Sequence, residues 1–114
     1  MNYIIQTPSA TRLKKEILDS VSAGADANGK SIDTWKCTET EEGDKVLVHI
    51  PDQWEYKGCI SLKINPIRSE LKVRFHYWES CANKDNYDDK IMLGRFTELV
   101  LVHFSYLIDK ITIE

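Results

Sequence analysis

Residues 34–78 decide the fold, and they read TWKCTETEEGDKVLVHIPDQWEYKGCISLKINPIRSELKVRFHYW. Apolar and polar residues alternate in four runs along this segment, which is typical of strands with one buried and one solvent-facing side. A hairpin turn around Gly43 separates the first two runs, Pro51 ends the second, and residues 65–70 form the last turn. The segment therefore predicts a four-stranded antiparallel meander.

The alternation also predicts which side chains face the core. From the first strand to the fourth, the inward sets are Trp35 and Cys37; Val46, Val48 and Ile50; Ile60, Leu62 and Ile64; and Leu71, Val73, Phe75 and Tyr77. The outward positions are predominantly basic, namely Lys36, Lys45, His49, Lys63, Lys72, Arg74 and His76, with Trp78 at the rim. We therefore predict an open, basic sheet face, and these residues are the candidate binding site.

Strand register has a consequence for the charges on this face. If the third and fourth strands pair with both apolar sets on one side, Lys63 must lie opposite either Lys72 or Arg74. Like charges that lie opposite each other cost a few tenths of a kcal/mol to about 1 kcal/mol, unless an anion or an acidic surface covers them. The sequence thus predicts either a mildly strained solvated surface or a contact surface for something acidic.

A first helix is predicted before the meander. Thr7 is the expected cap and Pro8 the expected first helical residue, because a proline there loses no hydrogen bond. The apolar stripe of this helix consists of Ala10, Leu13, Ile17 and Val21, and Gly24 is the expected stop. Residues 23–31 are small and polar and are interpreted as a loop.

A second helix is predicted at residues 91–110 from the length of the segment, although residues 99–104 also have strong β propensity. Its polar wedge is narrow, so we expect it to contact the sheet and one further surface, either the first helix or a second copy. The expected homodimer contact consists of Phe96, Val100, Leu101, Phe104 and Ile108. Residues 111–114 are expected to add a short strand beside residues 3–6.

These elements predict one α+β domain that spans residues 1–114, with a four-stranded antiparallel meander and an N-terminal and a C-terminal helix on one face. A chain of 114 residues accommodates one core rather than two. The layout resembles that of small bacterial secretion chaperones and toxin-immunity proteins, a likeness of arrangement without a shared motif.

Composition restricts the classes of function. Lys and Arg number 15 against 18 Asp and Glu, and the net charge of -3 disfavours a general nucleic-acid or membrane-surface binder while allowing a local basic patch. The first residues lack the pattern of a signal peptide and no apolar stretch is long enough to span a bilayer, so we expect a reduced, cytoplasmic compartment and no membrane contact. No cofactor is expected, and no metal ion, because the histidines have no ligand neighbours at metal-site spacing.

The leading interpretation is a small protein-binding or adaptor module, chaperone-like or immunity-like, whose basic face contacts an unknown protein with an acidic surface. Binding of single-stranded nucleic acid by the same face is the alternative, with lysines on phosphates and rings on bases.

A cysteine-dependent enzyme is the third interpretation. Cys59 shares the outward face with His76, and nearby cations would lower the pKa of its thiol. The familiar catalytic and phosphate-binding motifs are absent from the sequence, so an enzyme is the less favoured class. His103, in the apolar stripe of the second helix, is interpreted as a core histidine with a hydrogen-bond acceptor.

Overall fold

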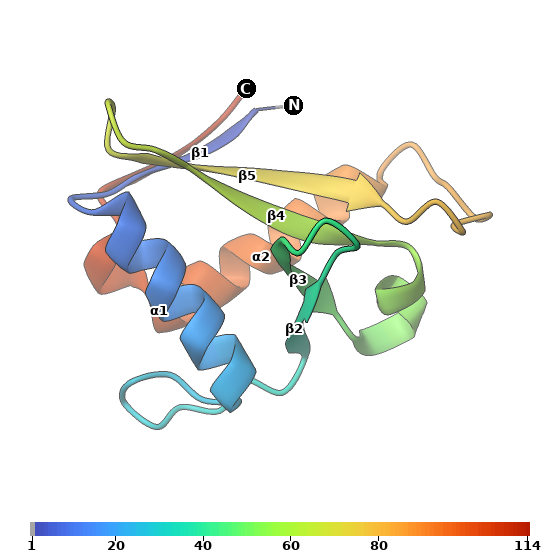
Figure 1. The fold of residues 1–114 in the computed structure, drawn as a ribbon, viewed down its shortest axis with the longest axis horizontal. Helices are drawn as coiled ribbons and strands as arrows, with labels where there is room; N and C mark the ends of the chain where they lie inside the picture. Colours follow the sequence, from blue (N-terminus) through green and yellow to red (C-terminus); the bar gives the residue numbers. More distant parts are fainter. Residues whose placement is uncertain (1) are drawn as a thin grey trace.

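The computed structural model describes residues 2–114 (Figure 1). The elements in chain order are β1 (Tyr3–Gln6), α1 (Ala10–Ala23), β2 (Trp35–Glu39), β3 (Lys45–His49), the 3₁₀ helix η1 (Pro51–Tyr56), β4 (Gly58–Asn65), β5 (Glu70–Tyr77), α2 (Asp88–His103), the 3₁₀ turn η2 (Ser105–Leu107) and β6 (Lys110–Ile113). The predicted α+β class is confirmed. The chain is more than a meander flanked by two helices, because one strand also precedes α1 and another follows α2.

The sheet has six antiparallel strands in the order β2-β3-β4-β5-β1-β6, so the predicted four-stranded meander is wrong. The two ends of the chain supply the additional strands, which lie side by side in Figure 1. Ile5 pairs with Ile111 of β6 and, on its other side, with Leu71 of β5. The expected pairing of the terminal segments is therefore confirmed, whereas their attachment to β5 was not predicted, because a four-residue strand carries too little alternation to show a partner.

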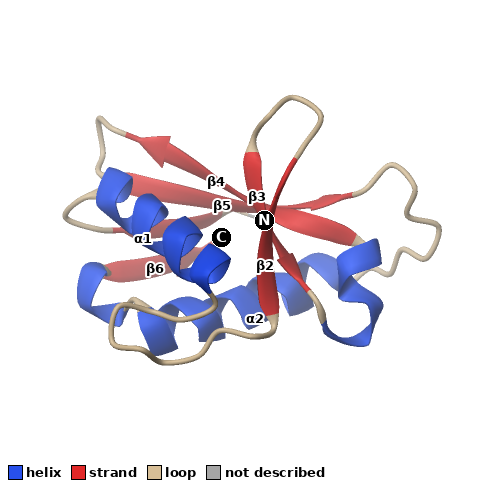
Figure 2. Ribbon diagram, turned by 60° about the horizontal axis from the view of Figure 1, so that its bottom comes forward, coloured by secondary structure: helices blue, strands red, loops and turns tan. Residues whose placement is uncertain are grey.

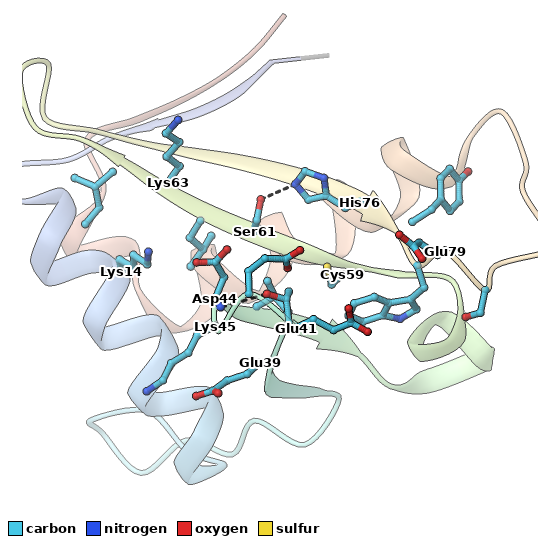
Figure 3. A pocket seen from close by; sticks show the side chains of 18 residues that line it. Lys14, Glu39, Glu41, Asp44, Lys45, Cys59, Ser61, Lys63, His76 and Glu79 are labelled. Atoms are coloured by element: carbon cyan, nitrogen blue, oxygen red, sulfur yellow. Dashed lines mark hydrogen bonds between the residues drawn. The ribbon is translucent and has the colours of Figure 1, made fainter.

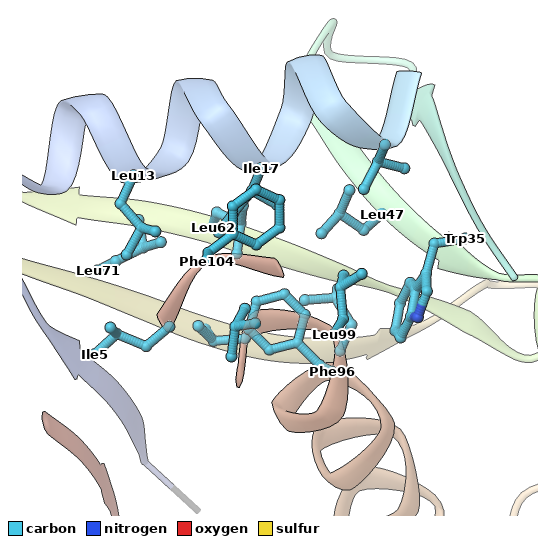
Figure 4. Close-up of a cluster of buried hydrophobic side chains, with 14 of the residues drawn as sticks. Ile5, Leu13, Ile17, Trp35, Leu47, Leu62, Leu71, Phe96, Leu99 and Phe104 are labelled. Carbon is cyan, nitrogen blue, oxygen red and sulfur yellow. The ribbon is translucent and has the colours of Figure 1, made fainter. Parts of the chain in front are cut away.

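Both helices cover the same side of the sheet and leave the other side open (Figures 1 and 2). Between them lies one main core, to which β1, β4, β5 and both helices contribute (Figure 4). Its fully buried side chains include Tyr3, Leu13, Ile17, Leu47, Ile60, Leu71, Val73 and Phe96. The predicted inward sets of the third and fourth strands are confirmed, apart from the partial exposure of their outer members.

Helix α1 begins two residues later than predicted. Ser9 is its cap, accepting a hydrogen bond from the amide of Arg12 at 3.2 Å. Thr7 instead donates its hydroxyl to the carbonyl of Leu107 at 2.6 Å, which ties the start of α1 to the end of the chain. The predicted stop at Gly24 is confirmed, since Gly24 adopts the left-handed conformation with φ 80°.

Helix α2 includes residues 99–103 despite their β propensity, but it ends at His103, well before the predicted residue 110. The chain must turn back there, because the amide of Asp109 bonds to the carbonyl of Gln6 at 2.8 Å and starts the pairing of β6 with β1. Among residues 2–114, no helix is both long enough and apolar enough to cross a membrane.

The residues expected at a homodimer contact divide into two groups. Phe96, Val100 and Phe104 are buried in this chain's own core and cannot contact a second copy. Leu101 of α2 is 52% exposed and Ile108, which follows η2, is partly buried, so the homodimer contact stays a prediction that is restricted to these two residues.

Strand β3 faces the opposite way from the prediction. Leu47 points into the main core, which places Lys45 and His49 on the helix-covered side, while Val46 and Val48 point to the other side. Four consecutive residues of β3, from Val46 to His49, are buried, so both faces of the strand are covered and alternation alone could not orient it.

Candidate functional site

The outward side chains of β4 and β5 form the candidate site, as predicted. Lys63 lies directly opposite Lys72, and the next outward pair joins Ser61 to Arg74. His76 follows on the same face, opposite Cys59. The sequence allowed either Lys72 or Arg74 opposite Lys63. The structure shows Lys72 as the direct neighbour, and Arg74 is the diagonal neighbour.

The cations at the centre of this face lack ionic partners. Within residues 2–114, no carboxylate lies at ion-pair distance from Lys63, Lys72 or Arg74. Lys36 shares the face but is bound, since its Nζ lies 2.8 Å from Glu55. Glu70 is the acidic residue of β5 on this side, at the far end of the strand. Among the described residues, the central cations of this face therefore have no carboxylate in direct contact.

Lys45 and His49, predicted to belong to this face, are not part of it. His49 is buried with its ring centroid 4.6 Å from that of Trp35. Burial lowers the pKa of His49, and nearby Arg95 lowers it further, so the imidazole is neutral at pH 7. His49 therefore belongs to the packing of β2 against β3 rather than to a charged surface.

Cys59 does not have the properties of a nucleophile. It is buried in a small cluster on the open side of the sheet, with Val46, Val48 and the partly buried Trp78. Burial raises the pKa of the Cys59 thiol to about 11, which is the reverse of the expected lowering. His76 directs its Nε2 to the hydroxyl of Ser61, at 2.8 Å, rather than to Cys59.

Trp78 is likewise engaged within the protein. Its Nε1 donates to the carbonyl of Glu55 at 2.8 Å, which anchors the ring between η1 and the strands. Its ring packs on the small cluster of Val46, Val48 and Cys59. The predicted rim residue is therefore present on the open side but is used for packing.

A cleft lies where the β2–β3 hairpin separates from β4. Strand β3 pairs with β4 through Leu47 and Ile60, and beyond this pair the hairpin tip moves away from the sheet. The resulting cleft has a volume of about 1000 Å³ (Figure 3). Its walls differ in charge: the hairpin contributes Glu39, Glu41, Glu42, Asp44 and Lys45, whereas the rest of the lining contributes Lys14, Lys63 and His76 and one carboxylate, that of Glu79.

A buried ionic network is centred on Asp88 and was not predicted from the sequence. The carboxylate of Asp88 is fully buried and accepts hydrogen bonds from Lys57 at 2.9 Å, Tyr77 at 2.8 Å and the amide of Asp85 at 2.8 Å. Burial alone would raise the pKa of Asp88, but these hydrogen bonds outweigh it and hold the pKa below its usual value. Nothing in the spacing of Lys57 and Asp88 in the sequence indicates that they meet.

His103 is the core histidine that the sequence predicted. Its Nδ1 lies 2.7 Å from the carboxylate of Asp26, and both side chains are nearly buried. The bond from His103, together with the amides of Asn28 and Lys30, keeps the pKa of Asp26 below its usual value. This pair attaches the loop after α1 to the end of α2.

Comparisons with known proteins assign no family to this chain: no family model matches it, and searches of curated proteins and of solved structures found no match.

Proposed function

We propose that this protein is a small protein-binding module that contacts an acidic partner through the open face of β4 and β5. The observation that carries the proposal is the direct opposition of Lys63 and Lys72, with Arg74 on the neighbouring pair. Such an arrangement destabilises the free protein by a few tenths of a kcal/mol to about 1 kcal/mol, and a partner's carboxylates remove that cost. Because the protein has a net charge of -3, its overall charge does not attract acidic groups, and the attraction depends on this local cluster of cations.

The same face supports the binding of single-stranded nucleic acid less well. Such platforms combine free aromatic rings with cations, so that bases stack beside bound phosphates. Trp78, the ring available here, is held by Glu55 and packed on β3. A partner that the face recognises through charge and backbone shape therefore fits better than one that it would recognise through base stacking.

The test is an affinity capture from native lysate with three forms of the full chain. Lys63→Glu with Arg74→Glu reverses the charge of the open face, and Lys30→Glu with Lys90→Glu makes the same change in charge at exposed sites elsewhere. Wild type and the second variant should retain the same acidic proteins, and the first variant should lose them. If Lys63→Glu with Arg74→Glu retains the partners of wild type, the proposal is wrong.

A further inference from the structure

We infer that the partner supplies an extended segment that pairs with the free edge of β4 and places a carboxylate opposite Lys63. The inference rests on the proposed protein-binding function and adds the form and the chemistry of the bound segment. It follows from three observations: an unpaired strand edge, a row of side chains that ends at that edge, and an acidic residue of the chain itself that is in register with the row.

The first observation is the unpaired edge. Strand β5 pairs with β4 along its whole length, from Gly58 to Asn65, whereas β3 pairs with it only at Ile60. Alternate residues of an antiparallel strand direct their amide and carbonyl groups to each neighbour. Beyond Ile60, no strand among residues 2–114 is in register with β4 on the side away from β5, so the backbone groups of Leu62 and Ile64 that point to this side belong to no ladder. An unpaired edge beside a cleft of about 1000 Å³ is a template for an added strand.

The second observation is the row of side chains that reaches this edge. On the open face, register pairs align Thr112 of β6, Ile4 of β1, Lys72 of β5 and Lys63 of β4. The next position in the row is vacant, because β3 has separated from β4 there. A strand added at the edge of β4 places one side chain at this position, directly beside Lys63 and near Lys72. A carboxylate at this position offsets the repulsion between the two lysines.

The third observation is that the hairpin carries a carboxylate in register for the same position. Continuing the register from Leu47 and Ile60 by three residues brings Asp44 opposite Lys63. In the structure Asp44 lies instead on the far wall of the cleft, with Glu39 and Glu41 (Figure 3). The extrapolated register therefore puts a carboxylate of the chain in line with Lys63, and the hairpin carboxylates on the far wall repel an incoming acidic segment.

The other face of the added strand determines which residue types are favoured at the remaining positions of the segment. Because side chains alternate along a strand, residues next to the one beside Lys63 face the side of Leu62 and Ile64. Leu62 is buried in the main core and Ile64 packs against it at the border of the cleft. Apolar residues are favoured at these positions, so the segment alternates acidic and apolar residues.

The experiment is a titration of the isotope-labelled protein with a synthetic peptide of about eight residues, the length of a common strand, in which Glu and Val alternate. Amide hydrogen exchange and chemical shifts report on Leu62 and Ile64, whose amides point to the free edge, and on Lys63 and Asn65, whose amides point to β5 and serve as internal controls. One control peptide has methyl groups on the amide nitrogens of alternate residues, which removes the backbone donors. A second control peptide alternates Lys and Val.

We expect the Glu–Val peptide to slow amide exchange at the edge of β4 and both control peptides to bind at least about tenfold more weakly. Lys63→Glu should weaken the Glu–Val peptide by about tenfold, Asp44→Asn should strengthen it, and Lys90→Glu should leave it unchanged. The absence of slowed exchange at these amides overturns the inference.

Failure of the inference and failure of the proposed function give different results. If the methylated peptide binds as tightly as the unmodified one while Lys63→Glu abolishes binding, the partner is acidic but adds no strand. If Lys63→Glu changes nothing, both proposals are wrong. If the edge amides are protected without peptide and in proportion to protein concentration, the occupant is a second copy and the assignment to a separate partner is wrong.

Discussion

Lys63 and Lys72 form one register pair of β4 and β5, with both side chains on the face that the helices leave uncovered. The other outward pairs of this ladder place a cation or a histidine opposite a neutral residue, or Glu70 opposite Asn65. Folding alone gives no reason for two lysines at opposed positions, because the pair costs free energy in the unbound protein. The pair has an explanation if something acidic covers it.

Lys72→Glu should stabilise the unbound protein. It replaces a repulsive cross-strand pair with an attractive one and should raise the free energy of unfolding by a few tenths of a kcal/mol to about 1 kcal/mol. Urea denaturation measures the change, and the gain should shrink at high salt, where exposed charges are screened. A Lys72→Glu protein less stable than wild type at low salt would contradict the assigned repulsion.

The Asp88 network should make stability depend on acid pH. The pKa of Asp88 in the folded protein lies below its ordinary value of 3.8, so the network stabilises the fold at higher pH, and the contribution is lost as the pH falls through the lower folded value. Asp88→Asn should lower stability at neutral pH and flatten the acid side of the stability profile. Urea midpoints measured from about pH 2 to pH 7 check both effects, and an unchanged profile would be inconsistent with the network.

Cys59 should be the slowest of the cysteines to react with iodoacetamide. Its thiol is buried and its pKa is raised to about 11, whereas Cys37 and Cys81 are partly exposed. Mass spectrometry of the folded protein near neutral pH should find Cys59 last among the labelled sites. Fast labelling of Cys59 would restore the cysteine-dependent enzyme as a candidate.

Gly58→Ala should strongly destabilise the protein. A Cβ atom at this position would overlap the carbonyl oxygen and carbon of His76, so β4 could not lie against β5 at its first residue. Gly94→Ala is the matched control, because its Cβ atom meets nothing within 4 Å and alanine in a helix is favoured by about 0.5–1 kcal/mol. The midpoint temperature of thermal unfolding should therefore fall for Gly58→Ala and rise for Gly94→Ala. Equal shifts of the two midpoints would contradict the described contact.

The sequence predicted what depends on local periodicity. Alternation oriented β2, β4 and β5 correctly, because each has one apolar and one polar face, and parity restricted Lys63 to two partners. The stripe that ends at Gly24 located α1. These features repeat over several residues, so a single sequence contains enough information to find them.

Contacts between distant segments could not be predicted in this way. Strand β3 has apolar residues on both faces, and only the small cluster around Cys59 and Trp78 explains its orientation. The end of α2 depends on the bond from Asp109 to Gln6, and the Lys57–Asp88 pair joins residues 31 positions apart. The cleft likewise follows from the separation of β3 from β4, for which no residue pattern is a known signal.

The affinity of the alternating Glu–Val peptide for the wild-type protein and for Lys63→Glu, measured by calorimetry at low salt, tests the central claim most directly. We predict saturable binding to wild type, about tenfold weaker binding to Lys63→Glu, and unchanged binding to Lys90→Glu. Equal affinity for wild type and Lys63→Glu would show that the opposed lysines do not form the contact surface for an acidic partner.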